Sequence, residues 1–147
     1  MKYEKFNIIS LNIENQTDIT SAFNNFFKGE RLEDFKVQLK SGAKKSAHAT
    51  LVSHIEKPPH ILILHLKRFY YDPELERPEK LSHYLEFDEV LYLSKDAREP
   101  AYHEATWKDK SEDTSLTQQR YELMSVVVHK GQSAVAGHYI TYARRGE

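Results

Sequence analysis

Cysteine is absent from the 147-residue chain. Disulfide bonds and thiolate zinc sites are therefore excluded, and the chain cannot itself supply a cysteine nucleophile. Long apolar runs are missing too, because no stretch approaches the roughly 18 residues of a membrane span and residues 1–5 lack the apolar segment of a signal peptide. From these absences we expect no membrane association and an intracellular location, in the cytoplasm, the nucleus or both.

The chain also lacks a large excess of positive or negative charge. The formal net charge is −1, so the basic footprint that binding to a phosphate backbone demands is lacking, and nucleic acid is not expected as a partner. The chain does contain 39% hydrophobic and 12% aromatic residues with five glycines and five prolines, which is typical of a folded globular protein. Its length suits one domain with a buried core.

The periodicity of the first residues predicts a strand followed by a helix. Apolar and polar residues divide between two faces over residues 6–13, as the two-residue period of a strand requires. Large apolar residues then recur at helical spacing over 19–27, with Thr17 and Asp18 available as caps. Gly29 is placed to end this short amphipathic helix.

A hairpin is predicted next. Residues 35–39 and 46–55 flank the turn-prone segment 40–44, and apolar residues alternate with more polar neighbours in the second arm. This pattern indicates a half-exposed hairpin over about 33–57.

The middle of the chain predicts two further strands and an irregular segment. Residues 61–69 begin with apolar residues on both faces, the pattern of a central strand that is covered on both sides. Pro73 and Pro78 break the next stretch, after which 84–93 alternates as a strand does. The mostly polar stretch of about 94–119 is expected to be an irregular excursion that contributes no core.

Two more strands are predicted at the end of the chain. They span residues 121–129 and 138–144, and the small-residue loop 130–137 that joins them is longer than a tight hairpin needs. Loops of this kind often carry a functional site.

Three segments follow one another in a fixed order: LILHLKRF at 62–69, YELMSVVVHKG at 121–131 and GHYITYAR at 137–144. Together they resemble the ubiquitin-specific proteases, a family of papain-like cysteine deubiquitinases. Residues 6–55 are also similar to the strand, short helix and fingers hairpin that precede the first segment in that family. The resemblance implies an α+β fold, mostly antiparallel β, in which residues 1–147 form the C-terminal, palm-and-fingers portion of the catalytic domain.

The resemblance also implies the site residues. His138 matches the family's catalytic histidine, the general base that takes the proton of a cysteine thiol in the thumb. The cysteine segment of the family has no counterpart in these 147 residues, and neither does the Asp or Asn that orients the histidine, so the identity of that third residue stays open. The loop of residues 131–137 matches a mobile loop that lies beside the C-terminal tail of ubiquitin in that family. This match implies substrate binding by Gly131, Ser133, Gly137 and Tyr139.

Eight histidines raise the question of a metal site. His60 and His65 lie five residues apart on an expected strand, which places them on opposite faces. His48 and His54 stand roughly 20 Å apart along an extended chain. No set has the spacing of zinc ligands, so we expect no metal and no other cofactor. We interpret His65 and His129 as packing or hydrogen-bonding residues, because strand histidines are more often structural than catalytic.

Three functions remain as hypotheses. The first is a part of a deubiquitinating enzyme that hydrolyses the bond after the C-terminal glycine of ubiquitin and is inactive without a cysteine-bearing thumb half. The second is a catalytically dead ubiquitin-binding or scaffolding module, and the third is an unrelated β-rich interaction domain. The expected partners are ubiquitin or ubiquitinated proteins, together with the thumb half or a second copy of this chain. The preferred ubiquitin linkage, the protein substrate and the oligomeric state stay open.

Overall fold

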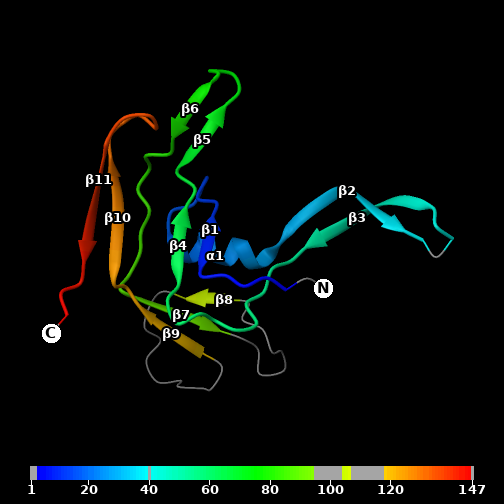
Figure 1. Cartoon of the computed structure of the whole chain (residues 1–147), viewed down its shortest axis with the longest axis horizontal. Helices are drawn as coiled ribbons and strands as arrows, with labels where there is room; N and C mark the ends of the chain where they lie inside the picture. The colour runs from blue at the N-terminus through cyan, green and yellow to red at the C-terminus, as the bar shows by residue number, and fades with distance from the viewer. Residues whose placement is uncertain (1–2, 40, 95–103, 107–117, 147) are drawn as a thin grey trace.

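The computed structural model describes residues 3–39, 41–94, 104–106 and 118–146. Its elements follow in the order β1 (Ile8–Leu11), α1 (Ile19–Lys28), β2 (Glu30–Gln38), β3 (Lys44–Leu51), β4 (Ile63–Leu66), β5 (Phe69–Asp72), β6 (Arg77–Lys80), β7 (Val90–Ser94), β8 (Glu104–Thr106), β9 (Gln118–Glu122), β10 (Ser125–Lys130) and β11 (His138–Ala143) (Figure 1). No helix in the described residues is long and apolar enough to cross a membrane.

The strands pair in several small sheets. β1 and β4 are parallel, whereas β2–β3, β5–β6 and β10–β11 are antiparallel hairpins and β7 lies between β8 and β9 in a three-stranded antiparallel sheet. Figure 1 shows the β2–β3 hairpin projecting away from the other strands, and the β5–β6 hairpin at the opposite end of the molecule from the β7–β9 sheet. This mostly antiparallel α+β architecture confirms the fold class predicted from the sequence.

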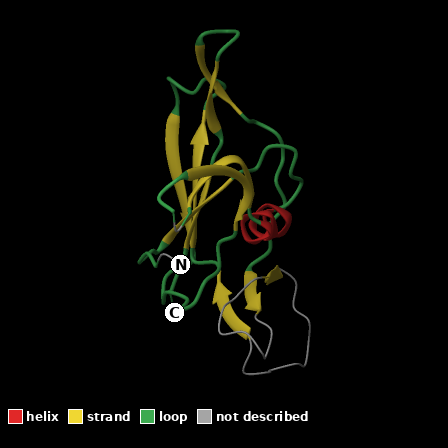
Figure 2. Ribbon diagram, turned by 90° about the vertical axis from the view of Figure 1, so that its right-hand side faces the viewer, coloured by secondary structure: helices red, strands yellow, loops and turns green. Residues whose placement is uncertain are grey.

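One hydrophobic core joins α1 to the strands around it. In Figure 2, α1 is seen nearly end-on beside the strands. The aromatic side chain of Phe23 is 0% exposed and stacks on that of Phe27 with 5.1 Å between ring centroids. In the part of the chain that the structure describes, the buried apolar residues are Ile9, Leu11, Ile13, Ile19, Ala22, Phe23, Phe27, Ile55, Leu85, Leu91 and Leu93.

Both ends of α1 are set by the residues that the sequence predicted. Asp18 is the N-cap, and its carboxylate accepts from the backbone N–H of Ser21 at 2.7 Å and from the Ser21 hydroxyl at 2.8 Å. Gly29 ends the helix with φ of 83°, and a Cβ at this position would lie 2.6 Å from the carbonyl oxygen of Leu51. Thr17 does not cap the helix but donates its hydroxyl to Asp18.

Replacing Asp18 by alanine is expected to lower the free energy of unfolding at neutral pH by about 1 kcal/mol, because an N-cap acceptor is lost. Desolvation acts to raise the pKa of Asp18, but hydrogen bonds from Ser21, Thr17 and Thr20 outweigh it and lower the pKa overall. Because the folded-state pKa lies below the unfolded value, this stabilisation is present above the unfolded pKa and is lost as pH falls through the folded one. Urea unfolding at neutral pH and at a pH well below 3.8 measures both effects.

Asp18→Asn is the matched control for this prediction. Its amide oxygen keeps an acceptor at the N-cap, so most of the stability should remain, but without a titrating carboxyl the loss on acidification should shrink. Equal pH dependence in the wild type and both variants would contradict the assignment.

The fingers-like hairpin is shifted relative to the prediction. β2 and β3 run from Glu30 to Leu51, whereas the sequence pattern indicated about 33–57. The turn lies where it was expected, since the backbone N–H of Gly42 donates to Leu39 at 2.8 Å. The hairpin begins earlier than predicted because charged residues in the first half of β2 interrupt the alternation of apolar and polar residues. It ends earlier because the residues after Leu51 are not paired with β2.

Residues 61–69 do not form one covered central strand, so that prediction is wrong. β4 ends at Leu66, and the chain bends where the Arg68 guanidinium donates to the carbonyl oxygens of Leu81 at 2.9 Å and His83 at 3.1 Å. Desolvation lowers the pKa of Arg68. Ile63 is 44% exposed, so the outer face of β4 is open in this chain even though its pattern is apolar on both faces.

The prolines after β4 do not exclude strands. Pro78 lies inside β6, opposite Tyr71 of β5, where a missing N–H is tolerated because a two-stranded hairpin has outward-facing edges. The carboxylate of Asp72 accepts from the backbone N–H groups of Glu74 and Leu75 and thereby forms the turn between the two strands.

The strand predicted over 84–93 is shorter in the structure. β7 covers only Val90–Ser94, because the preceding backbone bonds elsewhere: the N–H of Glu86 donates to Thr17 at 2.9 Å, and the carbonyl of Glu86 accepts from Ile19 at 3.0 Å. These bonds tie the start of α1 to the chain before β7.

Two predictions for the last third differ from the structure. The polar excursion of 94–119 contributes β8 to the β7–β9 sheet; residues 95–103 and 107–117 lie outside the described residues. The strand predicted over 121–129 is divided between two sheets, with β9 pairing with β7 and β10 pairing with β11. The division occurs where the N–H of Leu123 donates to Glu89 at 2.8 Å and the chain leaves the first sheet.

Candidate functional site

His138 is the first residue of β11, at the point where the loop of residues 131–137 rejoins the sheet. Its cross-strand partner is Lys130, the last residue of β10, and its side chain is exposed. The alternation of strand side chains places it on the same face as Ile140 and Tyr142. An exposed imidazole on the first residue of a hydrogen-bonded strand has a defined position and is accessible to a group from outside the described residues.

Gly137 allows the backbone before His138 to pass close to another histidine. A Cβ on Gly137 would lie 2.3 Å from Nε2 of His129 and 2.5 Å from the carbonyl oxygen of Lys130. Distances of this size are never tolerated by a real side chain, and one of the two obstacles is backbone, which cannot rotate away. The imidazole of His129 and the backbone of Lys130 are therefore what lies against this glycine.

Replacing Gly137 by alanine is therefore expected to push the start of β11 away from β10. We expect a loss of about 1–3 kcal/mol in the free energy of unfolding, the usual cost of overpacking, and altered chemical shifts at His138. Urea unfolding and NMR of the imidazole measure the two effects. Gly42→Ala is the control, because its Cβ would meet nothing within 4 Å even though its φ of 82° carries some strain. A Gly137→Ala chain with unchanged His138 shifts would contradict the assignment.

His129 is packed between two aromatic rings. Its ring centroid lies 5.3 Å from that of Phe69 and 4.9 Å from that of Tyr139. Its Nδ1 atom is buried and has no hydrogen-bond partner among the described residues. His65 instead lies 3.0 Å from the hydroxyl of Ser10, measured at Nδ1. Both histidines thus pack or hydrogen-bond, as we interpreted them from the sequence.

The predicted substrate-binding residues lie in or beside the loop. The ends of the loop touch, because a Cβ on Gly131 would lie 3.0 Å from the Cα of Gly137. Ser133 accepts the N–H of Val135 at 3.1 Å and so shapes the loop internally. Tyr139 is 69% exposed and, one residue after His138, points to the opposite face of β11.

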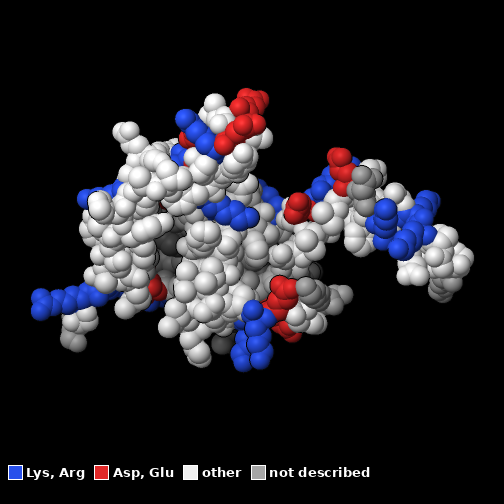
Figure 3. All heavy atoms as spheres, turned by 45° about the horizontal axis from the view of Figure 1, so that its top comes forward, with Lys and Arg blue, Asp and Glu red and all other residues white. Residues whose placement is uncertain are grey.

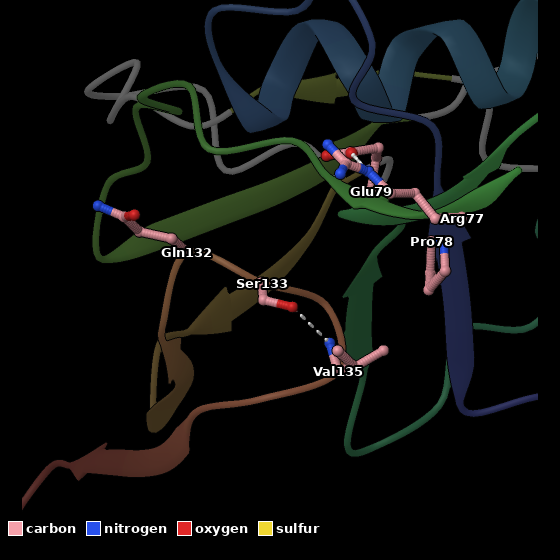
Figure 4. A pocket seen from close by; sticks show the side chains of 6 residues that line it. All are labelled: Arg77, Pro78, Glu79, Gln132, Ser133 and Val135. Carbon is pink, nitrogen blue, oxygen red and sulfur yellow. Dashed lines mark hydrogen bonds and ion pairs between the residues drawn. The ribbon is translucent and has the colours of Figure 1, made fainter. Parts of the chain in front are cut away.

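A hollow of about 410 Å³ separates the loop from the β5–β6 hairpin. Figure 4 shows Arg77, Pro78 and Glu79 of β6 on one side of it, and Ser133 bonded to Val135 within the loop on the other. The residues that line it are Arg77, Pro78, Glu79, Gln132, Ser133 and Val135. Ser133 is thus the predicted site residue that borders this hollow, between two segments far apart in the sequence.

Lys80 was missed by the sequence reasoning. Its Nζ donates to the carbonyl oxygen of His129 at 3.0 Å and to that of Gly131 at 2.6 Å, across the base of the loop. In the sequence, Lys80 stands among charged residues and looks like an ordinary surface lysine, so no local signal distinguishes it.

Exposed charged groups on β9 and just after β11 pair with one another. The Arg120 guanidinium bonds to Glu122, which also accepts from Arg144 at 3.1 Å. The hydrogen bond from Arg120 is the main reason why the pKa of Glu122 is lowered. On the face shown in Figure 3, charged side chains of both signs gather on the β2–β3 and β5–β6 hairpins. Within the described residues, no three His, Asp or Glu side chains are grouped as a metal site.

Comparison with known proteins decides the family. The family model described as ubiquitin carboxyl-terminal hydrolase matches residues 6–147, nearly the entire chain. The chain belongs to this family. The resemblance that the three sequence segments indicated is thereby confirmed.

Relatives in the ubiquitin carboxyl-terminal hydrolase family are similar over almost the full chain. Ubiquitin carboxyl-terminal hydrolase 4 of Arabidopsis thaliana is 36% identical over 143 residues, which are 96% of this chain and 34% of the relative. Ubiquitin carboxyl-terminal hydrolase 12 of Salmo salar is 32% identical over 145 residues, 97% of this chain and 35% of the relative. The chain thus spans about a third of the length of these curated relatives.

A solved structure is similar in fold. The structure of the SAGA Ubp8/Sgf11/Sus1/Sgf73 DUB module bound to ubiquitin aldehyde matches with a TM-score of 0.62 and 25% identity, over 95% of this chain and 28% of the compared chain. The papain-like fold expected from the sequence agrees with this similarity. The roles of His138, Gly131, Ser133, Gly137 and Tyr139 stay predictions, which the geometry above places around one loop.

Proposed function

We propose that this ubiquitin carboxyl-terminal hydrolase chain is the palm-and-fingers portion of a deubiquitinating cysteine protease and that His138 is its general base. The observation that carries the proposal is an exposed histidine at a fixed loop-to-strand junction, within a family-matched segment. A cysteine outside these 147 residues would give its thiol proton to His138, and the thiolate would attack the carbonyl carbon of ubiquitin's last glycine. The amine then leaves with that proton, and water hydrolyses the acyl-enzyme.

Ubiquitin is the proposed partner. One solved structure similar to this chain is described as bound to ubiquitin aldehyde and another as bound to monoubiquitin. We place the C-terminal tail of ubiquitin along the loop of residues 131–137, where Gly131, Ser133, Gly137 and Tyr139 would contact it. Ser133 also borders the hollow between this loop and β6.

Mixing the chain with a separately expressed cysteine-bearing half tests the proposed function. Cleavage of a ubiquitin-amide reporter should appear only in the mixture, because the chain alone has no thiol. A ubiquitin probe with a thiol-reactive end should label the added half and never this chain. Absence of cleavage in a mixture whose halves bind each other would count against the proposal.

The absence of cysteine supports a second candidate, a catalytically dead ubiquitin-binding module. NMR titration with ubiquitin separates the two candidates in combination with the reconstitution. Shifts in the 131–137 loop without cleavage in any mixture would favour the module. No shifts at millimolar ubiquitin would count against both candidates.

The outer face of β1–β4 is expected to bind a further protein surface. Ile8 and Ile63 are cross-strand partners there and are 51% and 44% exposed. The two side chains form an apolar patch that is contiguous across the two strands, and such patches mark interaction sites. We propose that the cysteine-bearing half covers this face when it is present and that a second copy of the chain does so when it is not.

Sedimentation velocity of the chain alone should therefore show concentration-dependent association, because pairing of the outer faces removes apolar surface from water. Ile63→Lys should shift the distribution towards monomer, since it places a charge on this face. Tyr3→Lys, at a residue that is 69% exposed and outside β1 and β4, is the control and should associate like the wild type. A compact monomer at high concentration would argue against the proposed coverage.

A further inference from the structure

Two cross-strand pairs from different hairpins meet beside the loop that precedes His138. Phe69 and Lys80 lie opposite one another in β5–β6, and His129 and Tyr139 lie opposite one another in β10–β11. The ring of Phe69 meets that of His129 nearly edge-on, with 5.3 Å between centroids. The two hairpins are therefore joined at this point by an aromatic contact.

Lys80 adds a polar contact to this junction. Its Nζ donates to the carbonyl oxygens of His129 at 3.0 Å and Gly131 at 2.6 Å. These two residues flank Lys130, which pairs with His138 at the end of the ladder. Hydrogen bonds from a charged donor are stronger than neutral ones, so the ammonium group fixes the path along which the chain leaves β10.

His129 fixes the other end of the loop. Gly137 passes so close to the imidazole that a Cβ would lie 2.3 Å from Nε2. Because His129 is itself packed between Phe69 and Tyr139, the ring forms a fixed surface against which Gly137 rests. Lys80 thus holds the loop by a hydrogen bond where it leaves β10, and His129 contacts the loop where it returns to β11.

Resting on the function proposed above, we infer that Lys80 and His129 are positioning residues for His138. Neither acts on the reacting atoms. They hold the two ends of the loop, so that the backbone of His138 is placed before a ligand arrives. The β5–β6 hairpin, which supplies Lys80, is thereby coupled to the proposed general base, and a shift of this hairpin shifts the imidazole.

NMR of the 147-residue chain without ubiquitin tests this inference independently of any reaction. The unmodified chain should show an NOE between Hε1 of His129 and Hα of Gly137, and backbone order parameters near 0.85 at Gly131 and His138. Lys80→Met keeps the apolar stem but removes both hydrogen bonds, so the NOE should disappear and the order parameters should fall below about 0.6. Lys80→Arg returns N–H donors and should restore both signals.

Lys67→Met is the matched control, because Lys67 is an exposed lysine of the β4–β5 bend and lies outside the junction. It should leave both signals unchanged. The inference is overturned if the unmodified chain lacks the NOE, if Lys80→Met keeps its order parameters, or if Lys67→Met has the same effect. It is also overturned if Lys80→Met loses the amide dispersion of α1, because the loss is then general unfolding. Failed cleavage with an intact NOE would instead count against the proposed reaction.

Discussion

His138→Ala is expected to reduce cleavage of a ubiquitin-amide reporter by roughly 10³-fold or more in the reconstituted enzyme. Without the imidazole, most of the cysteine stays a protonated thiol at neutral pH, and no group delivers a proton to the leaving amine. Members of a catalytic unit lose most of their effect when one is removed, so little partial activity should remain. The measurement is kcat/KM with the cysteine-bearing half at saturation.

The control for this prediction is His60→Ala. His60 is exposed, lies before β4 and is outside the loop, so its removal should leave kcat/KM unchanged. The affinity of His138→Ala for ubiquitin, measured by NMR titration, should stay within about twofold of the wild-type affinity. The substitution removes a group that reacts and leaves the ubiquitin-binding contacts in place. An activity loss that is matched by an equal loss of ubiquitin affinity would contradict a role for His138 as general base.

Features that depend on nearby residues could be predicted from the sequence. The ends of α1 are an example, because Asp18 caps the helix through Ser21, three residues on, and Gly29 ends it through its own φ. The β2–β3 turn is another, since it closes within a few residues. Short-range periods and caps determine such features whatever the rest of the chain does.

Features that depend on partners distant in the sequence could not be predicted from the sequence. The strand predicted over 121–129 divides because Leu123 bonds to Glu89, more than thirty residues earlier in the chain. Pro78 looks like a strand breaker, but its hairpin tolerates it. In the first case a hydrogen bond to a distant residue ends the strand, and in the second an unpaired strand edge allows a proline within it. Neither can be inferred from the neighbouring residues in the sequence.

The candidate site divides in the same way. The Gly137-His138-Tyr139 segment could be found because it is continuous in the sequence and matches a family. Lys80 could not be found, because the carbonyl oxygens that it bonds lie 49 and 51 residues further along the chain. The sequence thus indicates the group that would react, whereas the residues that hold it become visible only when two hairpins are brought together.

Phe23→Ala is expected to remove a large part of the stability of the chain. Phe23 is 0% exposed, stacks on Phe27 at 5.1 Å and lies 6.2 Å from the ring of Phe26, so truncation loses both burial and ring contacts and leaves a cavity. Substitutions of this kind cost about 3–5 kcal/mol. Domains of this size are stable by only about 5–15 kcal/mol in total. Urea unfolding followed by circular dichroism measures the loss.

The consequence should reach the candidate site, although Phe23 lies in α1. The carbonyl of Glu86 accepts from Ile19 at the first turn of α1, and that link continues into β7, β9 and then β10. Weakening α1 should therefore make the His138 amide exchange faster with solvent, in the same cooperative transition as the helix amides. Phe35→Ala, at a residue that is 47% exposed on β2, is the control and should cost about 0.5 kcal/mol or less. A Phe23→Ala chain in which helix amides lose protection while His138 keeps it would contradict this cooperative link between the core and the β10–β11 hairpin.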